Sequence, residues 1–202
     1  MNKEISELIQ LEAKIYGSNY SEQAANSYPM TNGALECGLT EKEFLLITML
    51  ASNGENLIQK LLYSRGNPTD LELKLWEYLD SAINKLPIEN KVDCVYRMTA
   101  NSYFQTSQIH TMVEVPFYMT ASLMELSTDC PVEYKIELAN NTKARSLYMV
   151  FEVVPQLPEF QVEFPRNTKF FVDDIIQMNG NTVVLLAEQV GQGQVPEPSI
   201  YK

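Results

Sequence analysis

Side chains that could bind a metal or act as nucleophiles are few and widely spaced in this sequence. The chain has three cysteines and one histidine, namely Cys37, Cys94, Cys130 and His110. No CxxC or CxxH pair is present, and a structural zinc site needs about four such ligands. The odd number of cysteines does not suggest a disulfide framework, so we expect buried free thiols in a reduced compartment.

His110 is equally weak as a candidate catalytic base. It lies in a polar stretch and has no serine or cysteine partner in a recognisable motif, so the sequence does not support a hydrolase triad. Neither GxGxxG nor the phosphate-loop pattern GxxxxGK followed by Ser or Thr occurs. The Rossmann and P-loop interpretations therefore lose their main support.

The chain is acidic, which limits the partners it can bind. It carries 15 Lys and Arg against 26 Asp and Glu, for a net charge of -11. A phosphate backbone must be met by clustered Lys and Arg, so we expect neither nucleic-acid binding nor an anionic membrane surface. With 202 residues, 45% of them hydrophobic, the chain suits one domain with an appendage. A small-molecule ligand or a protein partner fits this composition better.

The start of the chain has no targeting signal that we can recognise. Residues 1–16 carry several Lys and Glu without an apolar stretch, and no run of about 18 apolar residues could span a membrane. We therefore expect a protein that is cytoplasmic at synthesis. Leaderless secretion or injection is compatible with the same pattern.

The first 86 residues show the apolar spacing of helices. Intervals of three and four residues predict helices over residues 3–16, from Thr40 toward Gly54, over about 55–64 and over about 70–85. Thr40 and Glu43 form a capping-box pattern at the start of the second helix, and Pro87 stops the last one. Residues 17–36 are rich in Ser, Asn, Gly and Tyr, and are predicted to be loop.

After Pro87 the pattern changes to strands rich in Val, Ile, Phe and Tyr. The predicted strands are 92–97, 113–120, 132–138, 148–154, 159–164, 168–176 and 182–189. Asn179-Gly180 between two apolar runs indicates a hairpin, because a type I′ turn needs positive φ at both central residues. Helices followed by mostly antiparallel strands predict an α+β domain.

Five blocks occur in a recognisable order along this pattern. They are 39–43 (LTEKE), 79–87 (LDSAINKLP), 95–97 (VYR), 117–123 (FYMTASL) and 159–170 (EFQVEFPRNTKF). Their order resembles that of ADP-ribosyltransferases of the arginine-centred Arg/Ser/Glu class, which includes bacterial toxins, phage enzymes and vertebrate ecto-enzymes. The resemblance covers about residues 39–190.

The resemblance implies a fold, a substrate and a reaction. The expected fold has N-terminal helices followed by two packed, mainly antiparallel β-sheets around an NAD cleft. It divides the chain into an N-terminal helix and linker at 1–38, an ADP-ribosyltransferase-like domain at 39–190 and a flexible tail at 191–202. The implied reaction splits the nicotinamide glycosidic bond of NAD and passes ADP-ribose to a protein side chain or to water.

The resemblance also assigns roles to single residues. Arg97 stands where the family's arginine anchors the diphosphate of NAD, since a guanidinium fork matches phosphate oxygens. Met119 and Ala121 fall on the two serines of the family's S-T-S block, and Thr120 alone matches it. A methionine cannot donate a hydrogen bond, which departs from the family pattern. Tyr118 or Phe104 could stack on nicotinamide.

Two registers remain open for the catalytic carboxylate, which would stabilise the developing positive charge on the ribose. Counting back from Phe164-Pro165 makes Glu159 the first glutamate and puts Gln161 at the catalytic position, and this is the register we favour. The alternative is the Q-x-E form, with Glu163 catalytic. Both registers put the residue on the same strand face, because side chains alternate with period two. A plain edge strand with polar residues toward water is a third interpretation.

Two functional hypotheses follow. In the first, the protein is an NAD-dependent mono-ADP-ribosyltransferase that modifies a protein acceptor, with an activity weakened by its substitutions. In the second, the fold is kept, catalysis is lost and the protein is a toxin-like pseudoenzyme that serves as a binding or interaction module. Met119 and Gln161 favour this second hypothesis.

Overall fold

The structure is a computed structural model, and it describes residues 30–51, 70–125, 129–151, 161–178 and 180–191. The chain separates into two compact units. The first, a helical unit, comprises residues up to Pro87 together with 147–158, and the second, a strand unit, comprises 88–146 and the residues from Glu159 onward. No helix in the described part of the chain is both long and apolar enough to cross a bilayer.

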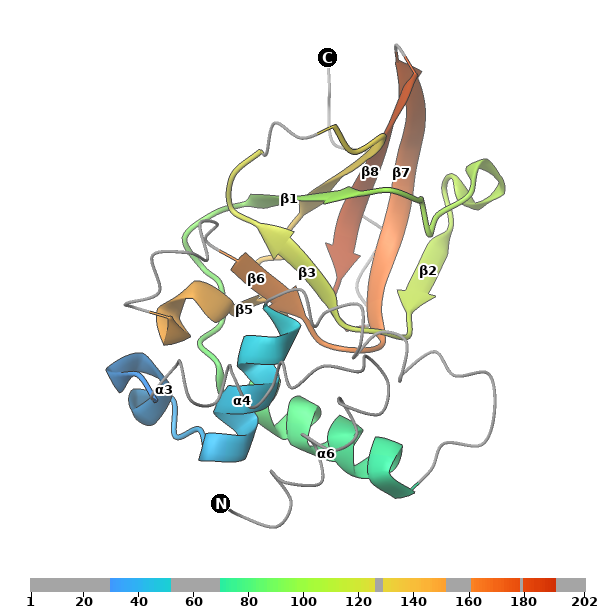
Figure 1. The fold of residues 1–202 in the computed structure, drawn as a ribbon. Coiled ribbons are helices and arrows are strands. Elements are labelled where there is room, and N and C mark those ends of the chain that lie inside the picture. Colours follow the sequence, from blue (N-terminus) through green and yellow to red (C-terminus); the bar gives the residue numbers. More distant parts are fainter. Residues whose placement is uncertain (1–29, 52–69, 126–128, 152–160, 179, 192–202) are drawn as a thin grey trace. The chain divides into compact units, whose positions relative to one another are not determined.

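Among its described residues, the helical unit contains three α-helices and one 3-10 turn (Figure 1). Their bounds are α3 Asn32–Glu36, α4 Glu41–Leu50, α6 Asp70–Lys85 and η2 Leu147–Val150. The helix predicted over about 70–85 is confirmed, and its apolar stripe faces the core. This stripe consists of Leu75, Leu79, Ala82, Ile83 and Leu86, all buried.

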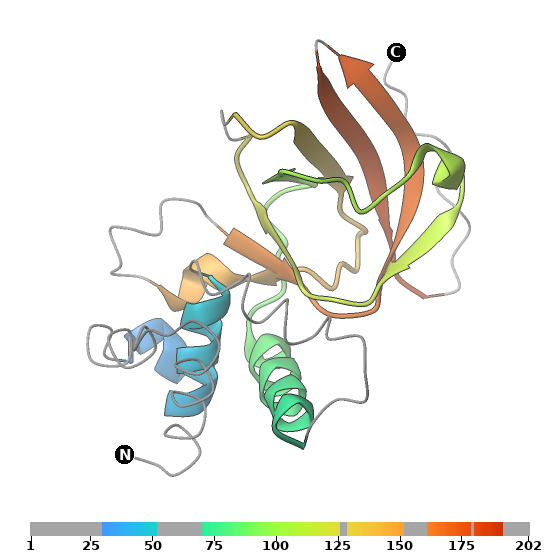
Figure 2. The ribbon, with the colours of Figure 1, turned by 45° about the vertical axis from the view of Figure 1, so that its right-hand side comes forward.

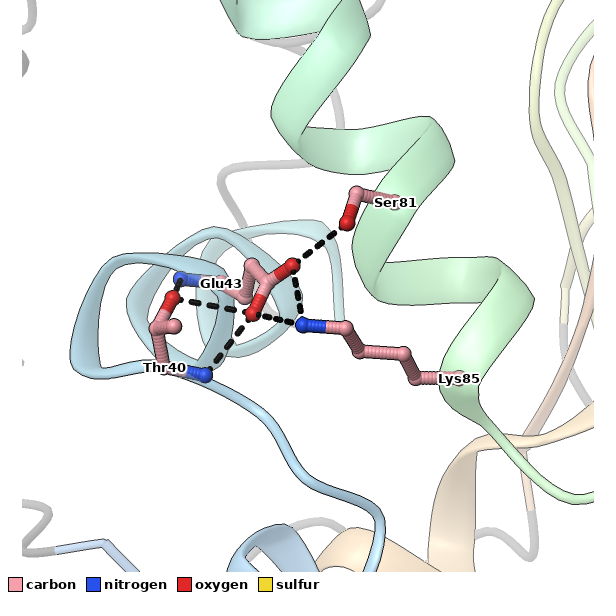
Figure 3. Close-up of polar contacts among 4 residues, drawn as sticks. All are labelled: Thr40, Glu43, Ser81 and Lys85. Atoms are coloured by element: carbon pink, nitrogen blue, oxygen red, sulfur yellow. Dashed lines mark hydrogen bonds and ion pairs between the residues drawn. The ribbon is translucent and has the colours of Figure 1, made fainter.

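A buried carboxylate joins α4 to α6, as Figure 3 shows. The predicted capping box forms, with Thr40 N donating to Glu43 Oε2 at 2.8 Å and Glu43 N donating to Thr40 Oγ1 at 3.3 Å. From α6, Ser81 Oγ donates to Glu43 Oε1 at 2.7 Å, and Lys85 Nζ contacts both oxygens. Burial would raise the pKa of Glu43, but the hydrogen bonds from Lys85, Ser81 and Thr40 lower it to about 2.

The strand unit holds one eight-stranded sheet in the order β2-β7-β8-β4-β1-β3-β6-β5 (Figure 1). The strands are β1 Cys94–Thr99, β2 Met112–Val115, β3 Met119–Ser122, β4 Val132–Glu137, β5 Arg145–Ser146, β6 Gln161–Phe164, β7 Thr168–Met178 and β8 Asn181–Gln189. Every neighbouring pair is antiparallel except β4 with β8. β7 and β8 flank the predicted hairpin turn, where Gly180 has φ 87°.

This sheet curls, so that strands far apart in its order meet across the core (Figure 2). Phe164 of β6 lies 5.2 Å, centroid to centroid, from Phe170 of β7, although four strands separate β6 from β7 in the sheet. The α+β class is confirmed. The expected two sheets are the two halves of one sheet, joined where β1 pairs with β3 through Tyr96 and Ser122.

Several predicted elements differ from the structure. The predicted loop 17–36 contains α3, which Thr31 caps by accepting from Ala34 N. The predicted strand 113–120 is two strands separated at Pro116, which has no N–H for a ladder. The start of the predicted strand 148–154 belongs instead to the 3-10 turn Leu147–Val150, and the two-residue β5 was not predicted.

Other expectations fall outside what the structure tests. The predicted helices at 3–16 and 55–64 and most of the tail lie outside the described residues, and the domain boundaries at 38 and 190 stay predictions. The three cysteines carry free thiols, but they are half-buried and not buried as expected. Burial raises the pKa of the Cys37 and Cys94 thiols, which makes them poor nucleophiles.

Candidate active site

Arg97 reaches from β1 to the neighbouring strand β3. β1 pairs with β4 along its whole length, and Arg97 lies directly opposite Tyr134. On its other side β1 meets β3 only through Tyr96 and Ser122, one residue before Arg97. Beyond this pair, a side-chain hydrogen bond connects the two strands: Arg97 Nη1 donates to the carbonyl oxygen of Thr120 at 2.6 Å. The guanidinium is therefore fixed against the strand that carries Thr120.

Thr120 in turn holds Glu163. The two residues are directly opposite in the antiparallel pair β3/β6, and Thr120 Oγ1 donates to Glu163 Oε2 at 2.7 Å. The side chain of Glu163 is fully buried, at 0% exposure. Arg97, Thr120 and Glu163 thus form one hydrogen-bonded series, although 23 and 43 positions separate its members along the chain. The structure thus brings Arg97 and Glu163, two residues singled out from the sequence, to the same threonine.

Arg145 lies across β6 from Thr120 and was not predicted from the sequence. It is directly opposite Glu163 in the β5/β6 pair, where Cβ atoms are typically about 5 Å apart and side chains share one face. Burial lowers the pKa of the Arg145 guanidinium, which is half-buried. A buried carboxylate is costly unless it is hydrogen-bonded and its charge is balanced. Thr120 supplies the hydrogen bond, and Arg145 brings a positive charge to the next strand.

Gln161 and Ser122 extend the same polar face by one pair. They are directly opposite each other in β3/β6, two residues along from Thr120 and Glu163. Gln161 is half-exposed, whereas Ser122 is buried and its Oγ accepts from Met124 N at 3.1 Å. Ser122 was not singled out from the sequence, because the resemblance to the family's serine block was assigned to residues 119–121. The signal was available, since period-two alternation puts Thr120 and Ser122 on one face.

Tyr118, Met119 and Phe104 lie in the apolar core. Their side chains are 0%, 1% and 3% exposed. The ring of Phe104 contacts those of Tyr134 and Phe170 at 5.5 and 6.5 Å, and Arg166 lies 5.7 Å from the ring of Tyr118. The side chain of Glu163 is equally buried, so burial alone does not distinguish these residues from it. Their predicted contacts with NAD stay predictions, as does the role of Glu159, which is outside the described residues.

The polar series offers a definite set of chemical groups. Arg97 supplies a guanidinium that can bind phosphate oxygens, and Glu163 supplies a carboxylate that can stabilise a developing cation at low dielectric. In the described part of the chain, no group of three or more His, Cys, Asp or Glu could hold a metal ion. Together, Arg97 and Glu163 could bind a phosphate group and stabilise a positive charge.

Solved structures identify the fold. No protein-family model matches the chain, and no curated protein does. The type III effector XopAI from Xanthomonas axonopodis pv. citri is similar with a TM-score of 0.70 and 16% identity, over 94% of this chain and 84% of that one. The ADP-ribosyltransferase toxin Plx2a from Paenibacillus larvae is similar with a TM-score of 0.61 and 18% identity, over 85% and 96%.

A third similar structure contains a dinucleotide analogue. Exoenzyme S from Pseudomonas aeruginosa, in complex with human 14-3-3 protein beta and bound to carba-NAD, matches with a TM-score of 0.62 and 11% identity, over 95% and 94% of the two chains. Identities this low show the fold alone. The chain therefore has the α+β fold of ADP-ribosyltransferase toxins.

Proposed function

We propose that this protein is an NAD-dependent mono-ADP-ribosyltransferase that modifies a protein acceptor. One observation carries the proposal: on an ADP-ribosyltransferase fold, Arg97, Thr120 and Glu163 form one hydrogen-bonded series. NAD is the substrate that suits this pair of charged groups, because it joins a diphosphate to a ribose whose bond to nicotinamide can break. Carba-NAD bound to exoenzyme S supports the same choice.

Arg97 binds the diphosphate of NAD in this proposal. A guanidinium carries five N–H donors in a rigid fork, which suits the oxygens of a diphosphate. The bond from Nη1 to the Thr120 carbonyl oxygen sets the orientation of this fork before the ligand arrives. Such pre-organisation reduces the entropy that binding must remove.

Glu163 is the catalytic carboxylate in this proposal, which favours the Q-x-E register over the one we preferred from the sequence. The bond between ribose C1 and the nicotinamide nitrogen breaks, and nicotinamide leaves with the bonding electron pair. Glu163 stabilises the oxocarbenium-like ribose and accepts a hydrogen bond from its 2-hydroxyl. The acceptor then forms a bond to C1 and loses a proton, which transfers ADP-ribose.

The Q-x-E register explains the two departures from the family pattern, at Met119 and at Gln161. Thr120 supplies the hydroxyl beside the carboxylate, and Met119 belongs to the core behind the site. Gln161 then occupies the first position of the Q-x-E form and needs no negative charge. We propose that Met119 supports the site from the core, and the predicted contacts of Tyr118 and Met119 with NAD stay part of the proposal.

The protein acceptor belongs to a cell other than the producer in this proposal. Two of the similar structures are a type III effector and a toxin. We therefore propose that the protein acts after secretion or injection. Cytoplasmic expression should slow the growth of a target cell and leave the growth of the producing cell unchanged. This result would support action after secretion or injection.

Substitution of Arg97 tests NAD binding directly. We expect Arg97→Gln to weaken NAD affinity by about 10- to 100-fold, because a charge-assisted bidentate contact is worth about 1.5–3 kcal/mol. Arg97→Lys should fall between Arg97→Gln and the wild type, since an ammonium keeps the charge without the fork. Titration calorimetry measures each affinity. Lys143→Gln removes an exposed cation from the same unit and serves as the charge-matched control.

Three outcomes would contradict the proposal in different ways. If the wild type does not bind NAD at millimolar concentration, the site does not serve this ligand. If it binds NAD but releases no nicotinamide in the presence or absence of acceptor proteins, the protein is a binding module on the same fold. Equal affinities for wild type and Arg97→Gln would remove Arg97 from the site.

A further inference from the structure

We infer that Tyr103 is an aromatic platform on which a planar heterocycle of NAD stacks. The inference rests on the proposed function and adds a residue to it. Among the large hydrophobic side chains that are exposed in the described part of the chain, Tyr103 is the aromatic one, at 39% exposure. Its neighbour Phe104, which the sequence analysis named beside Tyr118 for stacking on nicotinamide, is 3% exposed.

The ring of Tyr103 is held in place from two sides. It makes edge-to-face contacts with Phe117 at 5.0 Å and 83° and with Phe104 at 5.4 Å and 90°. Its backbone N–H donates to Tyr134 Oη at 2.8 Å. An exposed ring fixed by a main-chain hydrogen bond and two ring contacts loses little further freedom when a ligand stacks on it.

The same hydrogen bond links Tyr103 to the residue that lies opposite Arg97 in the sheet. Tyr134 is directly opposite Arg97 in the β1/β4 pair, so the two side chains leave the sheet on one face. The hydroxyl at the tip of Tyr134 contacts the backbone of Tyr103. Tyr103 therefore lies on the side of the sheet from which Arg97 extends, and a ligand whose diphosphate meets Arg97 carries flat rings at both ends.

Nicotinamide and adenine share the chemistry that Tyr103 would recognise, because both are flat heteroaromatic rings. Stacking of such a ring on an aromatic side chain is worth about 1–3 kcal/mol, which corresponds to an affinity change of about 5- to 150-fold. Two fragments of NAD allow the binding of each ring to be measured on its own. ADP-ribose retains adenine, and nicotinamide mononucleotide retains nicotinamide.

Calorimetry with NAD and both fragments tests the inference. Tyr103→Ala should weaken NAD binding at least about fivefold, and Tyr103→Phe should bind within about twofold of the wild type, because the ring is retained. Tyr103→Ala should also weaken one of the two fragments, which identifies the stacked ring. Tyr78→Ala, which removes a half-exposed ring from α6, is the matched control.

Unchanged NAD affinity in Tyr103→Ala would overturn the inference, and so would an equal loss in Tyr103→Phe. Either result differs from failure of the proposed function, in which the wild type itself does not bind NAD. A second variant covers the case in which Tyr103→Ala misfolds. Tyr103→Trp adds a fluorophore to a chain whose single tryptophan is Trp76, and NAD should quench the added emission with the affinity measured by calorimetry. Absence of quenching at saturating NAD would also overturn the inference.

Discussion

Replacing Glu163 with glutamine should lower NAD hydrolysis by about 100- to 1,000-fold, the usual effect of removing one electrostatic contact to a transition state. The amide keeps the shape of the side chain and still accepts the hydrogen bond from Thr120, so only the negative charge is lost. NAD affinity should change by less than about threefold, because Arg97 is untouched. Nicotinamide release under saturating NAD measures the first quantity, and calorimetry measures the second.

The same substitution should not destabilise the protein. Glu163 is fully buried, and a neutral amide avoids the cost of desolvating a carboxylate. We therefore expect a melting temperature equal to or above that of the wild type, which separates a catalytic role from a structural one. Glu137→Gln, at an exposed position of β4, is the matched control for charge. Loss of hydrolysis in Glu159→Gln with full activity in Glu163→Gln would instead select the other register.

Replacing Glu43 with glutamine should destabilise the helical unit by about 2 kcal/mol. Removing one partner of a buried ion pair costs about 3–5 kcal/mol, and water reduces this cost here because the Lys85 side chain is 34% exposed. Urea denaturation followed by tryptophan fluorescence measures the change. The single tryptophan, Trp76, lies on α6, so its emission reports on the helical unit.

The contribution of Glu43 should also depend on pH in a defined direction. The pKa of Glu43 in the folded chain, about 2, is below its ordinary value of 4.5. A lowered pKa stabilises the folded state at pH values above the ordinary pKa, and this stabilisation is lost as pH falls from about 4.5 toward 2. Wild type and Glu43→Gln should therefore differ at pH 7 and converge near pH 2.

A control on the same helix isolates this effect. Glu41 lies in the first turn of α4 but is exposed, so Glu41→Gln should change the stability by less than about 0.5 kcal/mol. If Glu43→Gln unfolds at the same urea concentration as Glu41→Gln at pH 7, the ion pair between α4 and α6 does not stabilise the unit.

Elements encoded by local signals were predictable from the sequence. The helix at 70–85 follows from its apolar stripe, the capping box from the spacing of Thr40 and Glu43, and the last hairpin from Asn179-Gly180. Each signal acts over a few residues, so it does not depend on the rest of the fold. The single curled sheet was harder to predict from the sequence, because its curvature depends on which strands pair.

The candidate site was only partly predictable, because it also depends on which strands pair. Arg97, Thr120 and Glu163 were singled out from the sequence, but the choice between Glu159 and Glu163 depends on the register of β6 against β3. The two registers differ by two residues and put the catalytic position on the same strand face, so period-two alternation does not choose between them. Arg145 was missed because β5 is only two residues long and has no strand signal of its own.

A crystal structure of the protein with carba-NAD, in which the ribose ring oxygen is replaced by carbon, tests the central claim most directly. The account predicts the diphosphate within hydrogen-bond distance of the Arg97 guanidinium, and the 2-hydroxyl beside nicotinamide on a Glu163 carboxylate oxygen. A dinucleotide bound away from Arg97, or with Glu163 turned from the ribose, would contradict it.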